Sequence, residues 1–156
     1  MGTKTLSKRE IKELSPQISS LVSVSPKQKL EIIQEDKYTI LSVDDKPLLF
    51  SFEGKWLPLL RQLFSGQISV DYPKVTVDMG AVKFVANGAD IMRPGITHVD
   101  DGISAGGPVL IVDETHGKTL AIGVALFSSE EIRSREGGKV IRSAHAAGDR
   151  LWELTK

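Results

Sequence analysis

The sequence predicts an α+β fold, with a small N-terminal α/β domain followed by a C-terminal domain built as a partly closed β-barrel. Helical and strand patterns are mixed in the first half of the chain, whereas the second half holds several short strands with one early helix and glycines at the corners. The pattern changes at Tyr72-Pro73, so we expect domains at residues 1–73 and 74–156. A chain of 156 residues is long enough for two small domains.

Within residues 1–73, the pattern predicts two helices and three strands. Ser7 and Glu10 form a capping box that opens a helix through Leu14, and Ser15-Pro16 either ends this helix or starts the next. The segment KWLPLLRQLFSG places apolar side chains on one helical face, and Gly66 ends this second helix. Between the helices, the predicted strands are Leu30–Gln34, Tyr38–Val43 and Leu48–Phe52.

The stretch Val75–Gly95 is the most informative part of the chain, because it reads as a strand, a short helix and a second strand. Asp78 can cap the helix, and Asn87-Gly88 ends it, since glycine adopts a positive φ without a Cβ penalty. A second strand starts at Asp90–Met92, and Pro94-Gly95 turns the chain away from it. The helical residues expected to face the core are Ala81, Phe84 and Val85.

The remaining sequence predicts strands joined by turns, with one short helix. Gly123 lies inside a predicted strand and indicates a bend or a close approach of two backbones. Ser128–Glu131 fits the start of a short helical turn. The predicted strands are Pro108–Asp113, Thr119–Phe127, Lys139–Ala144 and Arg150–Leu154.

Composition narrows the classes of function. Lysine plus arginine and aspartate plus glutamate are equal at 20 each, so any RNA site must come from a local patch rather than from net charge. The absence of cysteine removes disulfides, thiolate nucleophiles and cysteine-ligated zinc. No apolar run approaches the ~20 residues that span a bilayer, and the polar start MGTKTLSKRE lacks a signal core. We expect a soluble cytoplasmic protein with no membrane partner.

Several segments of the second half together resemble a known domain. The segments VDMGAVKFVANGADIMRPGI, VLIV, AIGVALFSSEEI and GDRLWEL are similar to the PUA domain, and the resemblance runs from Lys74 to about Leu154. This domain is named for pseudouridine synthases and archaeosine transglycosylases, and it is an RNA-binding β pseudo-barrel. The resemblance therefore implies a C-terminal PUA pseudo-barrel that binds structured RNA.

The first half narrows the resemblance to one family. A strand pair like YTILSVDDKPLLFSF and a WLPLLRQLF helix, directly ahead of a PUA domain, resemble the malignant T-cell-amplified-sequence family and its archaeal relatives. The resemblance implies a cofactor-free RNA-binding adaptor in translation, with small-subunit rRNA or tRNA as the RNA. Eukaryotic members partner the density-regulated protein, but no segment here resembles it, so the translation-factor partner is left unidentified.

The resemblance also implies an RNA site, because in this family the groove between the PUA helix and the following strand takes the RNA backbone. Glycine lets a phosphate approach main-chain N–H groups, lysine supplies a charge-assisted contact, and arginine offers a planar fork. The alternative is that Asn87-Gly88 only ends a helix and that the cations form a solvated surface. The expected RNA-binding residues are Lys83, Asn87, Gly88, Ala89, Arg93, Pro94, Gly95, Lys139, Arg142 and Arg150.

Two clusters of titratable residues raise the question of catalysis or metal binding. Both fall in predicted turns, where histidine and aspartate commonly form local hydrogen bonds, and neither has metal-ligand spacing. A nucleophile elbow and a nucleotide-binding glycine loop are also missing from the sequence. We therefore expect neither an enzyme nor a metal site. The clusters are His98 with Asp100 and Asp101, and Asp113 with Glu114 and His116.

Two other functions remain open at the level of sequence. The chain could be a non-catalytic accessory subunit of a tRNA or rRNA modification enzyme, since PUA domains commonly accompany such enzymes. It could also be a protein-interaction module whose PUA domain does not bind RNA, which the zero net charge allows. Convergence of Lys83, Arg93 and Arg142 on one positive groove would favour RNA binding.

Overall fold

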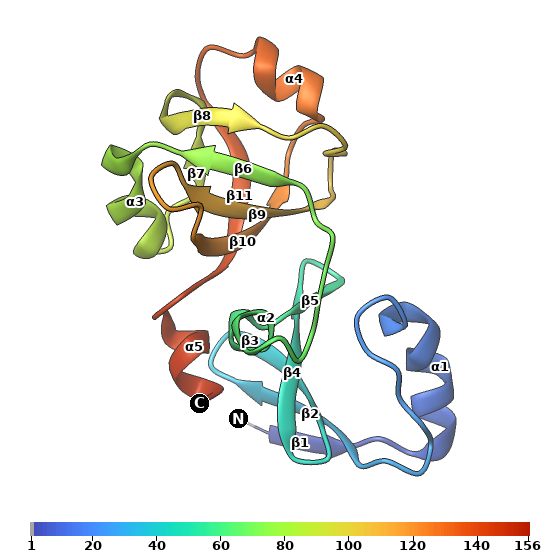
Figure 1. The fold of residues 1–156 in the computed structure, drawn as a ribbon. Helices are drawn as coiled ribbons and strands as arrows, with labels where there is room; N and C mark the ends of the chain where they lie inside the picture. Colours follow the sequence, from blue (N-terminus) through green and yellow to red (C-terminus); the bar gives the residue numbers. More distant parts are fainter. Residues whose placement is uncertain (1) are drawn as a thin grey trace. The chain divides into compact units, whose positions relative to one another are not determined.

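The computed structural model describes residues 2–156, which divide into two compact units, one up to Val70 and one from Asp71 to Leu154 (Figure 1). Each unit combines a sheet with short helices, so the predicted α+β class is confirmed. No helix within the described residues is long and apolar enough to cross a membrane.

The N-terminal unit is a five-stranded antiparallel sheet in the order β1-β2-β3-β4-β5, with two helices. Its strands are β1 (Gly2–Thr5), β2 (Leu30–Glu35), β3 (Tyr38–Val43), β4 (Lys46–Phe52) and β5 (Lys55–Pro58), and its helices are α1 (Lys8–Ile18) and α2 (Leu60–Ser65). The predicted capping box opens α1, because Ser7 Oγ accepts the Glu10 N–H at 3.2 Å and the Glu10 carboxylate accepts the Ser7 N–H at 3.0 Å. The core of this unit joins α1 to the sheet through Ile11, Leu14, Ile18, Leu30, Leu41 and Leu49.

Two predicted helix boundaries in this unit are wrong. Helix α1 continues through Pro16 to Ile18, because Ile18 is fully buried and its packing offsets the hydrogen bond that proline cannot make. Lys55–Pro58 is strand β5 rather than the first turn of a helix. The residue before a proline is disfavoured in the α region, so Leu57 stays extended and α2 begins only at Leu60.

The C-terminal unit is a six-stranded, nearly closed sheet in the order β7-β11-β10-β9-β6-β8 (Figure 1). Only β6 and β9 run parallel among its paired strands within residues 2–156. Its strands are β6 (Lys74–Val77), β7 (Ile91–Met92), β8 (Ile96–Val99), β9 (Pro108–Asp113), β10 (Thr119–Ala125) and β11 (Lys139–Ala146). Its helices are α3 (Met79–Ala86), the 3-10 turn η1 (Arg93–Gly95), α4 (Ser129–Ser134) and α5 (Arg150–Leu154).

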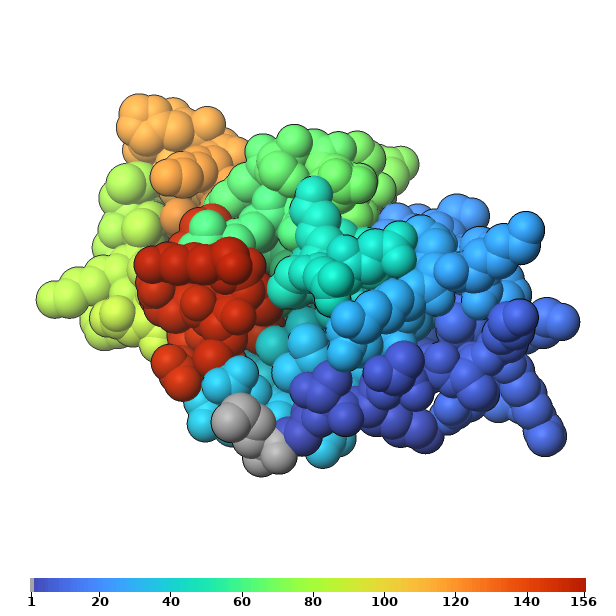
Figure 2. All heavy atoms as spheres, turned by 90° about the horizontal axis from the view of Figure 1, so that it is seen from below, coloured from blue at the N-terminus to red at the C-terminus, as the bar shows by residue number. Residues whose placement is uncertain are grey.

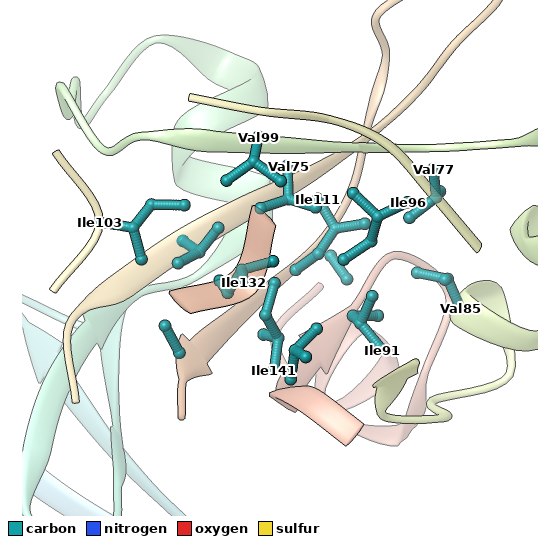
Figure 3. Close-up of a cluster of buried hydrophobic side chains, with 14 of the residues drawn as sticks. Val75, Val77, Val85, Ile91, Ile96, Val99, Ile103, Ile111, Ile132 and Ile141 are labelled. Atoms are coloured by element: carbon teal, nitrogen blue, oxygen red, sulfur yellow. The ribbon is translucent and has the colours of Figure 1, made fainter. Parts of the chain in front are cut away.

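The core of the C-terminal unit is made of aliphatic, mostly β-branched side chains. Figure 3 shows Val75 from β6, Ile111 from β9, Ile141 from β11 and Ile132 from α4 pointing toward one another, and all four are fully buried. Branched side chains pack well on pleated strands and lose little rotamer freedom there. The sheet is therefore wrapped around a rigid interior that fixes the positions of the surface elements.

The chain end after β11 differs from the prediction. Arg150–Leu154 forms helix α5 instead of a strand, and its exposed atoms lie at the surface, in red in Figure 2. The cause is Asp149, whose carboxylate accepts the Trp152 N–H and the Ala146 N–H, each at 2.8 Å, and lies 3.0 Å from His145 Nδ1. Strand β8 was also not predicted, so His98 lies on a strand and not in a turn.

Gly123 sits where β10 and β11 approach closely, as the sequence indicated. The register between the two strands shifts at Ile122 and Gly123. A Cβ atom at Gly123 would lie 2.5 Å from the Arg142 carbonyl oxygen and 2.8 Å from Ile141 Cγ2. Only glycine fits this bulge without moving the backbone of β11.

We expect Gly123→Ala to destabilise the C-terminal unit by about 1–3 kcal/mol, because the added methyl overlaps a backbone atom that cannot move alone. The measurement is chemical denaturation followed through NMR signals of β10 and β11. Gly137→Ala is the matched control, since a Cβ at Gly137 meets no atom within 4 Å. Equal stability of the two variants would contradict the close approach.

Candidate nucleic-acid interface

A groove of about 440 Å³ lies between α3 and β7, the two elements on which the sequence placed RNA binding. Asp78 caps α3, with its Oδ1 accepting the Ala81 N–H at 2.8 Å, while the Asp78 N–H donates to the Gly95 carbonyl at 2.9 Å. These bonds fix α3 against η1. The groove is lined by Val77, Asp78, Gly80, Ala81, Phe84, Val85, Ala89, Asp90, Ile91, Met92, Pro94 and Gly95.

Exposed apolar side chains flank the groove. Phe84 is 64% exposed, Met92 is 49% exposed and Met79 at the start of α3 is 48% exposed. The prediction that Phe84 faces the core is wrong, because Val85, helped by Ala81, already fills the narrow buried stripe of this short helix. In β7, side chains alternate, so Ile91 points inward and Met92 points to the solvent.

Three exposed cationic side chains lie on α3 and β11, next to this groove, although none of them is among its lining residues. Lys83 is exposed on the last turn of α3, and Lys139 and Arg142 are exposed on β11. Lys139 Nζ lies 2.9 Å from Asp90 Oδ2, and Asp90 Oδ1 accepts the Ser143 N–H at 2.8 Å. Burial alone would raise the pKa of Asp90, but the bonds from Lys139 and Ser143, together with the charges of Lys139 and Arg142, hold it below its ordinary value. The ionised Asp90 thus keeps both cations near the groove.

The turn after α3 is exposed but uses its main-chain donors internally. Gly88 has φ 87°, and the N–H groups of Asn87, Gly88 and Ala89 donate to carbonyls of α3 at 3.0–3.2 Å. A phosphate at this turn would therefore be held by side chains such as Lys83, not by these N–H groups.

The structure gives Arg93 a different environment from the one that its sequence suggested. The side chain is half-buried, its Nε donates to the Ile132 carbonyl at 2.7 Å and its Nη1 donates to the Ile96 carbonyl at 3.2 Å. The guanidinium thereby links η1 to α4 and β8. Arg150, on α5, is not among the residues that line the groove, and neither are Lys83, Arg93, Lys139 and Arg142, so the expected cations do not converge within it.

The titratable clusters form local hydrogen bonds. His98 Nε2 lies 3.2 Å from Asp100 Oδ1. Hydrogen bonds from the His116 and Lys118 N–H groups hold the pKa of Asp113 below its ordinary value. Among residues 2–156, no group of three or more histidine, aspartate and glutamate side chains is placed to hold a metal ion.

The rim residues Phe84 and Met92 were missed as contact candidates. Apolar spacing alone treats every hydrophobic side chain of a helix as core. The signal that could have found Met92 is its position beside Ile91, since one of two neighbouring strand residues must face outward.

Sequence comparison with known families identifies both halves of the chain. Residues 73–146 match the PUA domain, and residues 4–65 match a domain of unknown function, DUF1947. The nearly closed barrel with its helix-lined groove is thus a PUA domain, and the chain is a PUA-domain protein.

Relatives that match both halves of the chain define the family more closely. An uncharacterized protein of Methanocaldococcus jannaschii is 35% identical, with 96% of this chain and 94% of that protein covered. Translation machinery-associated protein 20 of Saccharomyces cerevisiae is 34% identical, with coverages of 97% and 87%. Malignant T-cell-amplified sequence 1-A of Xenopus laevis is 34% identical, with coverages of 74% and 65%. The chain belongs to the family that these proteins represent, as the sequence resemblance implied.

Solved structures share the same architecture. A hypothetical protein of Pyrococcus horikoshii OT3 has a TM-score of 0.75 and 32% identity, with 99% of this chain and 100% of that chain covered. A PUA-domain protein of Aeropyrum pernix K1, solved as a tartrate complex, has a TM-score of 0.76 and 29% identity, with coverages of 99% and 90%. The PUA pseudo-barrel preceded by an N-terminal sheet is therefore confirmed as the fold.

We expect Arg93→Gln to destabilise the C-terminal unit by about 1–3 kcal/mol, because the carbonyls of Ile96 and Ile132 lose a charged donor. Denaturation monitored by NMR signals of β8 and α4 measures the loss. Lys83→Gln, a change at an exposed lysine, is the control and is expected to stay within about 0.5 kcal/mol of the wild type. If Arg93→Gln unfolds at the same denaturant concentration as the wild type, the side-chain hydrogen bonds of Arg93 are not needed for stability.

Proposed function

We propose that this protein is a cytoplasmic RNA-binding adaptor in translation, and that its PUA domain binds structured RNA of the small ribosomal subunit or tRNA. The mechanism is binding and positioning, with no bond made or broken. Family membership supports the translation role, since a relative is named translation machinery-associated protein 20. The observation that carries RNA binding is the groove itself, which the exposed side chains of Phe84 and Met92 line. Exposed cations lie on the elements next to it, Lys83 on α3 and Lys139 and Arg142 on β11, the strand that pairs with β7.

Two kinds of contact fit this arrangement. An aromatic side chain with an open face can stack on an unpaired base, and stacking is the common way in which proteins hold single-stranded nucleotides. Lysine and arginine at the border can contact the flanking phosphates. We therefore propose that a looped-out or terminal nucleotide of a structured RNA enters the groove and stacks on Phe84.

The proposed RNA contacts keep most of the residues expected from the sequence. Residues 74–156 are proposed as the RNA-binding domain, and residues 1–73 as the domain that orients it or docks a translation factor. Arg93 is proposed to position the groove by holding η1 against β8 and α4, and Arg150 is no longer proposed as an RNA contact. The proposed contacts are Lys83, Phe84, Asn87, Gly88, Ala89, Met92, Pro94, Gly95, Lys139 and Arg142.

A protein-interaction role is the second candidate, because the exposed Met79, Phe84 and Met92 together form an apolar surface. The two functions differ in their response to salt. RNA binding weakens steeply as salt rises, whereas binding through an apolar surface does not. Crosslinking in cells, followed by sequencing of the attached RNA, tests the proposal directly. Enrichment of small-subunit rRNA or tRNA is expected, and recovery of neither would sink the RNA-binding function.

We expect Phe84→Ala to weaken RNA binding by about 5- to 100-fold, the range that loss of one base-stacking contact produces. Stability is expected to change little, because the ring is exposed. Fluorescence anisotropy with the RNA recovered by crosslinking measures the affinity. The matched control is Phe64→Ala, an exposed phenylalanine of the N-terminal unit, with unchanged affinity. Equal affinities for the two variants would remove Phe84 from the site.

A further inference from the structure

A second pocket, of about 260 Å³, lies along β8, which is one of the two end strands of the barrel sheet. It shares no lining residue with the α3–β7 groove. Three of its side chains carry guanidinium or imidazole groups, and such groups commonly bind phosphate in proteins. The pocket is lined by Arg93, Ile96, Thr97, His98, Val99 and Arg133.

Both arginines are held in place by main-chain carbonyls. Arg93 donates to the Ile96 and Ile132 carbonyls, and Arg133 Nη2 donates to the Val99 carbonyl at 2.7 Å. A guanidinium carries five N–H donors, so these bonds leave further donors on each arginine. Because the carbonyls already fix the side chains, a ligand would lose little affinity to their ordering.

Two acidic side chains lie next to the pocket, so a bound phosphate competes with them for the donors of Arg133 and His98. Asp101 Oδ1 lies 2.6 Å from Arg133 Nη2, but Asp101 is 93% exposed, and such surface ion pairs contribute little. Asp100 bonds to His98 and to the Lys74 N–H at 2.9 Å, so its carboxylate is tied to the strands. A phosphate in the pocket would take the place of the Asp101 carboxylate at Arg133 Nη2.

We propose that Arg93, Arg133 and His98 form a phosphate-binding subsite, separate from the base-binding groove. One possible source of the phosphate is the backbone of bound RNA, and this part of the inference rests on the proposed function. In turn η1, Arg93 lines this pocket and Pro94-Gly95 lines the groove. An RNA strand that crosses η1 would therefore pass from one site to the other. The other source is a free phosphate or a phosphorylated small molecule.

Titration with inorganic phosphate tests the subsite without RNA. Sodium phosphate replaces sodium chloride at constant ionic strength, and NMR follows the amides of Thr97 and His98 and the Nε–H signals of Arg93 and Arg133. Saturable shifts at these groups are expected. Arg133→Gln and His98→Gln are each expected to raise the phosphate Kd about tenfold through loss of a charge-assisted bond.

The control is Arg135→Gln, at the end of α4, whose guanidinium stacks on Phe127 at 3.5 Å and does not line the pocket. Its phosphate affinity is expected to match the wild type. Arg133 also holds a carbonyl of β8, so His98→Gln, at an exposed side chain, keeps the test valid if Arg133→Gln unfolds. Absence of saturable shifts in the wild type, or equal losses in the control, would overturn the subsite.

Salt dependence of RNA binding separates the two sources of phosphate. If RNA supplies the phosphate, Arg133→Gln, which removes one positive charge, lowers the slope of log affinity against log salt by about 1. If the slope is unchanged while phosphate binding is lost, the ligand is a free phosphate or a phosphorylated small molecule. If Phe84→Ala leaves the RNA affinity unchanged, this result counts against the groove as the RNA site. The phosphate titration is a separate measurement, and its result still decides whether the subsite exists.

Discussion

The hydrogen bonds of Arg93 join η1 to β8, α4 and the start of β11 within the C-terminal unit. The barrel sheet ends at β7 and β8, and neither end strand can satisfy all of its polar groups by pairing. Arg93 satisfies one carbonyl of β8 and one of α4 through its side chain, while its N–H donates to the Gly138 carbonyl ahead of β11 at 2.8 Å. The groove residues Met92 and Pro94 flank Arg93 in sequence, so this clamp also positions the candidate site.

The groove combines an apolar lining with nearby charge. Its lining is mostly apolar and includes the exposed Phe84 and Met92, and exposed cations lie on the elements next to it. An apolar lining suits the flat face of a base, and the border cations suit the charged backbone on either side. Because the chain has no net charge, the proposed attraction for RNA rests on this local arrangement and not on the charge of the whole chain.

Local signals in the sequence predicted much of the fold, and tertiary contacts decided the rest. The caps at Ser7 and Asp78 involve residues three positions apart, so spacing alone could reveal them. By contrast, Arg93 bonds to a carbonyl 39 residues away, which no local pattern encodes. The same limit applies to the site: the α3–β7 region was located through its turn chemistry, but the outward direction of Phe84 depends on how little of α3 the core needs to cover. The family resemblance added the fold name and the groove, which residue spacing could not supply.

The Lys139–Asp90 pair gives the groove a resident anion of its own. A phosphate that binds Lys139 exchanges one negative partner for another, so less solution cation and anion is reorganised than at an unpaired lysine. The salt slope of RNA binding would then count fewer phosphates than the protein touches. At the proposed site, any anion that approaches Lys139 must compete with the Asp90 carboxylate, so a ligand that also stacks a base in the groove would have the advantage over a simple anion.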